Sequence, residues 1–325
     1  MSAPSFVNSA YYNSGGGLNA TVNKPTGTGS GHLMLAFIHT GGDNPTSITA
    51  PSGWSTLQSH FAQYVGFACF YRWAGSSEPS SYQFSWNSNG WGVGGILTFS
   101  SVGSIGSSAK NYTSGTTVSV SAPSLAMNAN SVLVAGFGFK GNGSVSSPSG
   151  MTERIDAPHT NNNYPTTLGA STQDYLSAAS SGAKTATISA SSDRSAAVSV
   201  ELLGTNSNPD TPTLLTPADN LRQQGGNVDF SWSHSDPDGN PQAAYALRRQ
   251  KIGDSYEWWN GSNWVATQTF VSSSTGSATI DASTFERGVY TWSVATRDSM
   301  NATSAYSSQR TLEVIKFERW GAVQI

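Results

Sequence analysis

The chain has 325 residues, a net charge of −3 and charged side chains at only 11% of its positions, against about 25% in an average domain. Its Lys and Arg residues are scattered, which excludes the continuous basic surface that nucleic-acid binding requires. No apolar run approaches the roughly 20 residues of a membrane helix. Gly, Ser, Thr and Asn are abundant instead, and this composition favours short strands and turns over long helices.

The N-terminus contains neither a basic stretch nor an apolar core, so we expect no secretory signal and synthesis in a cytoplasm. The low charge is nevertheless typical of extracellular β proteins. A virion component that assembles inside a cell and leaves by lysis would have both properties, and so would a secreted protein recloned without its signal. The single cysteine, Cys69, lies in an apolar strand and is expected to be buried.

An apolar strand followed by a Pro-Ser-Gly turn occurs twice in the first two-thirds of the chain. The strands lie at 32–40 and 131–139, and the turns at 51–53 and 148–150, so the two copies are offset by 99 and 97 residues. We interpret residues 1–205 as a duplicated β unit, with copies at about 1–103 and 104–205. Frequent turn signals predict a jelly-roll-like β-sandwich. Because alternate strand residues share a face, one shared core should contain Leu33, Leu35, Phe37, Val132 and Val134.

Other segments of this domain carry less regular patterns. The Gly- and Ser-rich stretches 103–107 and 141–144 are predicted to be loops, and Trp54 and Trp73 are predicted to pack inside the sandwich. The copies differ most at 40–47 and 157–166. Long loops on a rigid sandwich often carry recognition, although a solvated connector is the favoured interpretation of the second segment.

A polar, Pro-containing linker is predicted at 206–211, and a second β-sandwich at 212–315. Within it, Asn260-Gly261 separates two short aromatic stretches, which predicts a hairpin because this dipeptide supplies the positive φ of a tight turn. Trp258 and Trp259 should point to opposite faces of their strand, so that one is buried and the other is at least partly exposed. The apolar tail 316–325 follows the last predicted strand.

The second domain resembles a fibronectin type III/Ig-like module. The resemblance is carried by Pro-Thr-Leu-Leu-Thr-Pro-Ala-Asp at 212–219, Phe-Ser-Trp at 230–232 before the turn at 236–240, and Tyr-Thr-Trp-Ser-Val at 290–294. Together with the duplicated Pro-Ser-Gly sandwich, it is similar to the minor tail proteins of tailed phages. That resemblance implies a virion location, assembly with other tail proteins, a homo-oligomer (a trimer is favoured) and contact with the host surface.

Candidate chemistry is sparse. Asp236, Asp238 and Asn240 alternate oxygen ligands as calcium loops do, but Pro237 and Gly239 make a turn without any ion. No other metal site or cofactor is expected, and the histidines lack metal-like spacing. Hydrolysis of a glycan needs two carboxylates across one cleft, and the least unsuitable pair is Glu153 with Asp156. We therefore expect a protein that is not an enzyme.

Aromatic side chains are the remaining candidates for recognition, because Trp and Tyr bury large areas at little entropic cost. Packing against the protein itself remains the alternative for each of them. Tyr11, Tyr12 and Trp86 are further candidates of this kind. The residues predicted to contact a ligand or partner are Trp91, His159, Tyr164, Trp258, Trp259, Trp264, Phe317 and Trp320. The last two belong to the tail, which we expect to dock on another subunit or virion protein.

These observations favour a structural phage-tail protein with a possible host-surface glycan as ligand. A stand-alone carbohydrate-binding protein is the first alternative, since it would use the same aromatic side chains. A glycan-degrading enzyme is the second, and it is disfavoured by the small number of carboxylates in the first domain.

Overall fold

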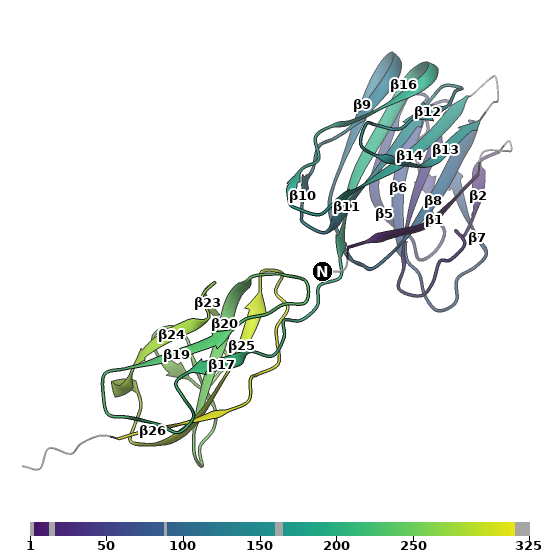
Figure 1. Ribbon diagram of the computed structural model, residues 1–325. Helices are drawn as coiled ribbons and strands as arrows, with labels where there is room; N and C mark the ends of the chain where they lie inside the picture. The colour runs from purple at the N-terminus through teal and green to yellow at the C-terminus, as the bar shows by residue number, and fades with distance from the viewer. Residues whose placement is uncertain (1–2, 13–16, 88–89, 160–164, 316–325) are drawn as a thin grey trace, which may run out of the picture. The chain divides into compact units, whose positions relative to one another are not determined.

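The computed structural model describes residues 3–12, 17–87, 90–159 and 165–315. The chain divides into two compact units, Ser2–Thr205 and a second that begins at Asn206 (Figure 1). Both are built of strands, and the only helical element in the described ranges is the 3-10 turn η1 (Ala282–Thr284). The prediction of an all-β chain is confirmed. Across those same ranges, no helix is long and apolar enough to span a membrane.

The first copy is a sandwich of one large and one small antiparallel sheet. The large sheet has the order β1-β8-β3-β6-β5, and the small sheet has the order β2-β7-β4. Their side chains meet in one apolar layer, in which Met34 and Ile38 of the large sheet pack against Phe84 of the small one. The strands are β1 (Ser5–Tyr12), β2 (Asn19–Asn23), β3 (Leu33–Thr40), β4 (Ile48–Thr49), β5 (Ser55–Ala62), β6 (Val65–Trp73), β7 (Ser81–Trp86) and β8 (Gly92–Ser100).

The second copy repeats this order with longer strands. Its large sheet is β9-β16-β11-β14-β13, and β12 pairs with the first half of β16. Each of β9 and β16 runs for 21 residues, so β9 replaces both β1 and β2, and β16 replaces both β7 and β8. The strands are β9 (Val102–Ala122), β10 (Ala126–Met127), β11 (Ser131–Phe139), β12 (Val145–Ser146), β13 (Thr152–His159), β14 (Thr166–Tyr175), β15 (Ala179–Ser180) and β16 (Lys184–Gly204).

The prediction that residues 103–107 form a loop is wrong, because they belong to β9. Gly and Ser have low strand propensity, but pairing with β16 supplies the backbone partners that the local sequence does not suggest. Residues 141–144 do lie outside the strands, as predicted.

The two large sheets face each other across one central core, which is the shared core that the alternation of apolar residues predicts. Leu33, Leu35 and Phe37 of β3 lie in it together with Val132 and Val134 of β11. Every residue of β3 is buried, because its other face is covered by the small sheet. Cys69 also lies in the central core, fully buried as expected.

The copies meet through unequal side chains. The offset of 99 residues makes Gly136 the counterpart of Phe37, and a Cβ on Gly136 would lie 2.4 Å from Cδ1 of that ring. Gly138 is likewise the counterpart of His39, and a Cβ there would lie 2.9 Å from the imidazole Cγ. Large side chains of the first copy therefore occupy space that only glycine leaves open in the second.

Both Pro-Ser-Gly turns have the same geometry. Trp54 N donates to Pro51 O at 3.3 Å, and Met151 N donates to Pro148 O at 3.1 Å. The glycine of each turn, Gly53 or Gly150, has φ of 85° or 77°. This is a type II turn, whose third position requires a positive φ and hence favours glycine. The repeated motif is therefore a scaffold element of each copy.

The second unit is a β-sandwich of a three-stranded sheet, β17-β19-β24, and a seven-stranded sheet, β18-β26-β25-β20-β21-β22 with β23 beside β20. Phe230 and Trp232 of one sheet pack against Trp292 of the other. The strands are β17 (Thr213–Thr216), β18 (Leu221–Gln223), β19 (Asn227–Ser233), β20 (Gln242–Lys251), β21 (Glu257–Trp259), β22 (Trp264–Val265), β23 (Val271–Ser272), β24 (Ser277–Asp281), β25 (Gly288–Asp298) and β26 (Arg310–Val314).

The segment 206–211, predicted as a linker, is bonded to the second unit. Asn206 Nδ2 donates to Asp298 Oδ2 at 2.9 Å, and its Oδ1 accepts from Asn240 Nδ2 at 2.7 Å. Asp210 N donates to Ser235 O at 2.9 Å. These contacts fix the chain entry into the second sandwich.

Candidate functional site

The predicted hairpin of the second unit is present, as β21 and β22. Asn260 N donates to Asn263 O at 3.0 Å, and Asn263 N donates back to Asn260 Oδ1 at 2.8 Å. Gly261 between them has φ of 100°, the positive value expected from the dipeptide. This turn brings three tryptophans together at one end of the large sheet.

The tryptophans of the hairpin lie on two faces, as expected. Trp259 is buried in the sandwich core and pairs across the hairpin with Trp264, with ring centroids 5.4 Å apart. Trp258 lies on the opposite face, half-buried, and its Nε1 donates to Tyr306 Oη at 2.7 Å. All three rings have intramolecular partners in the structure. Their role as ligand contacts stays a prediction.

Arg249 on β20 links this hairpin to the rest of the sandwich. Its guanidinium carbon lies 4.2 Å from the ring centre of Trp264 and 4.5 Å from that of Phe285. Its Nε and Nη2 both lie 2.9 Å from Glu257 Oε2, and Nη1 donates to Thr284 O at 3.1 Å. Burial lowers the pKa of Arg249, and the Glu257 carboxylate opposes that effect. The Arg249 guanidinium therefore joins the hairpin to the rest of the sandwich through cation–π contacts and an ion pair.

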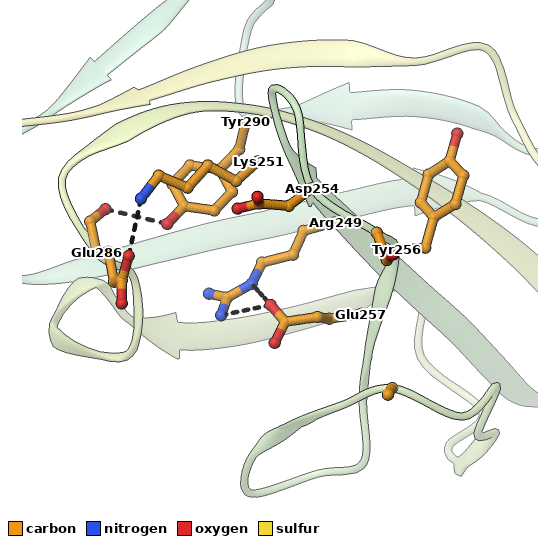
Figure 2. A pocket seen from close by; sticks show the side chains of 9 residues that line it. Arg249, Lys251, Asp254, Tyr256, Glu257, Glu286 and Tyr290 are labelled. Atoms are coloured by element: carbon orange, nitrogen blue, oxygen red, sulfur yellow. Dashed lines mark hydrogen bonds and ion pairs between the residues drawn. The ribbon is translucent and has the colours of Figure 1, made fainter.

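A polar pocket of about 370 Å³ opens beside Arg249 (Figure 2). Lys251 Nζ pairs with Glu286 Oε2 at 2.7 Å, and Tyr290 Oη donates to Glu286 O at 3.2 Å. Figure 2 shows these two contacts and the Arg249–Glu257 pair, with the Tyr256 ring turned away from them. The hydrogen bond to Glu286 raises the pKa of Lys251, and burial raises the pKa of Tyr290. Both pKa values therefore move further above neutral pH. The pocket offers hydrogen bonds to a small polar molecule, but these two groups are poor acid–base catalysts near pH 7.

The calcium candidates form a hydrogen-bonded turn. Asp236 Oδ1 accepts from Asp238 N at 2.8 Å and from Asn240 N at 3.2 Å, while Asp238 Oδ2 accepts from Ser207 N at 2.5 Å. Gly239 has φ of 75°, which completes the turn. In the described part of the chain, no group of three or more His, Cys, Asp and Glu side chains could hold a metal ion. These bonds form a turn without an ion, whereas Asp236 Oδ2 is buried and has no hydrogen-bond partner among the described residues. Calcium binding at this turn stays a prediction.

The other predicted contact residues do not lie in one site that the structure can define. Trp91 is half-buried just before β8, and its carbonyl accepts from Gly41 N at 3.0 Å. His159 is the last residue of β13, and only its backbone is among the described atoms. Tyr164, Phe317 and Trp320, with the whole tail 316–325, lie outside the described residues.

Several carboxylates of the first unit hold turns. Glu78 has a side chain only 3% exposed, and it accepts from Arg72 Nε at 2.9 Å, Gly75 N at 2.6 Å and Tyr82 Oη at 2.6 Å. Although burial opposes ionisation, these donors lower the pKa of Glu78. Glu201 is buried, and its Oε1 accepts from Asn128 N at 2.6 Å. Both carboxylates stabilise the scaffold.

The catalytic pair considered from the sequence lies on β13. Glu153 is exposed, whereas Asp156 is half-buried and its Oδ1 accepts from Val145 N at 3.0 Å. Asp156 therefore ties β13 to the start of β12. A register shift between Glu153 and Ile155 interrupts the pairing of β13 with β14 between the two carboxylates.

Two predicted tryptophan environments need correction. Trp73, expected inside the sandwich, is the last residue of β6 and is 40% exposed. Trp86, considered from the sequence as a ligand-contact candidate, is buried, and its Nε1 donates to Gly90 O at 2.9 Å. Trp54 packs as expected, with its ring centre 5.1 Å from that of Tyr82. The Gly-Ser-Ser stretch at 75–77, two residues after Trp73, is the sequence signal that its strand ends there.

Comparisons with known proteins leave the family open. No protein-family model matches the chain, and no curated protein matches it. Among solved structures, it is similar to a beta-1,2-glucanase from Parabacteroides distasonis, with 10% identity and a TM-score of 0.24 over 65% of this chain. The chain spans 37% of that protein, and a similarity of this size carries no argument about fold or function.

Proposed function

We propose that the chain is a structural protein of a phage tail, of the minor tail protein kind, which assembles with other virion proteins and contacts the host surface. The observation that carries this proposal is the succession of a duplicated β-sandwich and a second β-sandwich, whose sequence resembles a fibronectin type III module. Such rigid modules suit a protein that spaces and presents surfaces. The resemblance to minor tail proteins supplies the tail location.

A role without catalysis is supported by how the acidic groups are used. Glu78, whose side chain is 3% exposed, and the buried Glu201 accept hydrogen bonds from backbone amides of neighbouring turns, and the half-buried Asp236 does so in the second unit. A catalytic carboxylate must instead meet a substrate within hydrogen-bond reach. These groups serve as supports for loops, which fits an assembly protein.

Mass spectrometry of purified particles tests the tail location directly. The protein should be found in virions at a fixed ratio to the major tail proteins, and its absence from particles would overturn the proposal. Light scattering of the purified protein tests the homo-oligomer, for which a trimer is the expected state. A monomer at every concentration would remove the oligomeric part of the proposal.

A stand-alone carbohydrate-binding protein is the second candidate, and the exposed ring of Trp73 favours it. The two candidates differ in one observation, since a stand-alone protein would bind glycans but would not be incorporated into particles. The third candidate, a glycan-degrading enzyme, would require polysaccharide cleavage that Glu153→Gln abolishes.

A further inference from the structure

The two copies meet along an edge where β5 and β9 lie side by side, and we call this edge the seam. Gln58 Nε2 donates to Ser108 Oγ at 2.9 Å, and Lys110 Nζ donates to Ser59 O. The rings of His60 and Tyr112 stack across it, with centroids 4.2 Å apart. Over this stretch the seam is closed by side chains from both copies.

Toward the start of β9 the seam opens into a recess of about 500 Å³, a volume in the range of small-molecule sites. Its apolar lining belongs to the edge of the central core, against which Leu57, Tyr71 and Ile105 pack. The full lining is Leu57, Tyr71, Trp73, Gly103, Ser104, Ile105 and Gly106. Both copies therefore contribute to it, β5 and β6 from one and β9 from the other.

Two aromatic rings stand on one side of this recess. Tyr71 and Trp73 are alternate residues of β6, so their side chains lie on the same face of the sheet, about 7 Å apart along the strand. Trp73 is 40% exposed, and no other tryptophan in the described ranges is classed as exposed. Trp73 and Tyr71 therefore offer aromatic ring surface to a molecule in the recess.

The opposite side of the recess is backbone-rich. Residues 103–106 belong to an edge strand, because β9 pairs with β16 and with no further strand of the described chain. The register of β9 shifts between Ile105 and Ser108, where Ser107 N donates a hydrogen bond to Glu201 Oε2 at 3.3 Å. Such a bulge bends an edge strand and interrupts its pairing. Peptide groups and the Ser104 hydroxyl can therefore offer hydrogen bonds opposite the rings.

We propose that this recess binds a neutral saccharide unit. A sugar ring presents an apolar C–H face, which stacks on tryptophan or tyrosine, and hydroxyls around its rim, which bond to peptide groups and serine. None of the seven lining residues is charged, so an anionic or cationic ligand would find no ion-pair partner among them. Tyr71 and Trp73 supply the stacking surface, and residues 103–106 supply the polar side.

This inference deepens the proposed function, because it names the ligand class through which a tail protein would contact a host surface. The two can fail separately, since the recess is tested on the purified protein and the tail location on particles. If the protein binds a neutral glycan but is absent from particles, the recess proposal stands and the tail role is excluded. If it is present in particles but binds no neutral glycan, the tail role stands and the recess proposal is excluded.

A glycan array that carries neutral and anionic oligosaccharides, followed by calorimetry with the best neutral one, tests the proposal. The wild-type chain should bind neutral glycans, and Trp73→Ala should weaken binding about tenfold or more. Trp73→Phe should retain part of the affinity. Tyr11→Ala is the matched control, because Tyr11 is a 51% exposed aromatic of the same unit that does not line the recess.

Thermal unfolding of each variant shows whether the fold is kept. Trp73→Ala should still unfold cooperatively, but with a Tm lowered by several degrees, because more than half of the ring is buried. The proposal is overturned if no neutral glycan binds, if only anionic glycans bind, or if a correctly folded Trp73→Ala binds as tightly as wild type. An equal loss in Tyr11→Ala would also count against it.

Discussion

Lowering the pH from 6.5 to 4 should destabilise the first unit through His39, the buried imidazole between the two copies. The side chain is fully buried on β3, its Nδ1 lies 3.1 Å from Gly66 O, and its ring packs edge-on against Phe67 at 6.0 Å. Gly138 of the other copy covers it from the opposite side. Burial lowers the pKa of His39 from 6.5 to about 4, against the smaller effect of the Gly66 and Phe139 carbonyls.

The sign follows from proton binding in each state. Above pH 6.5 the imidazole is neutral whether the chain is folded or unfolded, so it adds no pH dependence. Between pH 6.5 and about 4 the unfolded chain binds a proton that the folded chain excludes, so the free energy of unfolding decreases as the pH is lowered. At about 1.4 kcal/mol per pH unit, the loss over this interval amounts to about 3 kcal/mol.

Hydrogen exchange of peptides from β3 and β11 in the full chain, measured from pH 7.5 to 4, reports this loss after correction for intrinsic exchange. The variant His39→Gln should show a shallower dependence of stability on pH, whatever its stability at pH 7.5. His60→Gln is the control, because His60 also has a pKa lowered by burial but lies on the surface seam. Equal slopes for wild type and His39→Gln would refute the reasoning.

Three further changes test other contacts. Gly136→Ala should lower the free energy of unfolding in urea by about 1–3 kcal/mol, since the added Cβ would meet the Phe37 ring. Adding Phe37→Leu should recover part of that loss, and strictly additive effects of the two substitutions would contradict the contact. Glu78→Gln should cost about 1–3 kcal/mol in the same assay, because the amide cannot accept all four hydrogen bonds, and an unchanged midpoint would show that they contribute little. Arg249→Met should lower the stability of the second unit by about 2 kcal/mol through the lost ion pair and ring contacts, and Arg249→Lys should restore little of it; full rescue by lysine would exclude the planar stacking.

Much of the architecture follows from local patterns in the sequence. Alternating apolar residues identified the shared core of the two copies, and the structure contains it. The Pro-Ser-Gly turns and the Asn-Gly hairpin were predictable because each needs a residue with positive φ at one defined position. The opposite faces of Trp258 and Trp259 follow from strand geometry alone.

Less of the candidate sites was predictable. The sequence predicted a loop at 103–107, and the structure has an edge strand there, because its hydrogen-bond partners lie almost a hundred residues away in β16. The exposure of Trp73 and the burial of Trp86 were both assigned wrongly. A ring at a strand end is buried only if another sheet extends over it, and that depends on strand lengths in the other copy.

The all-β class, the duplication and the turns were predictable because they depend on composition, on the two-residue period of strands and on backbone conformation. The fit of the two copies, with Phe37 over Gly136, and the opening of their seam beside Trp73 could be seen only in the folded chain. Alternation defines which face of a strand is apolar. Contact between two faces depends on the volumes and edges of residues that are distant in the chain.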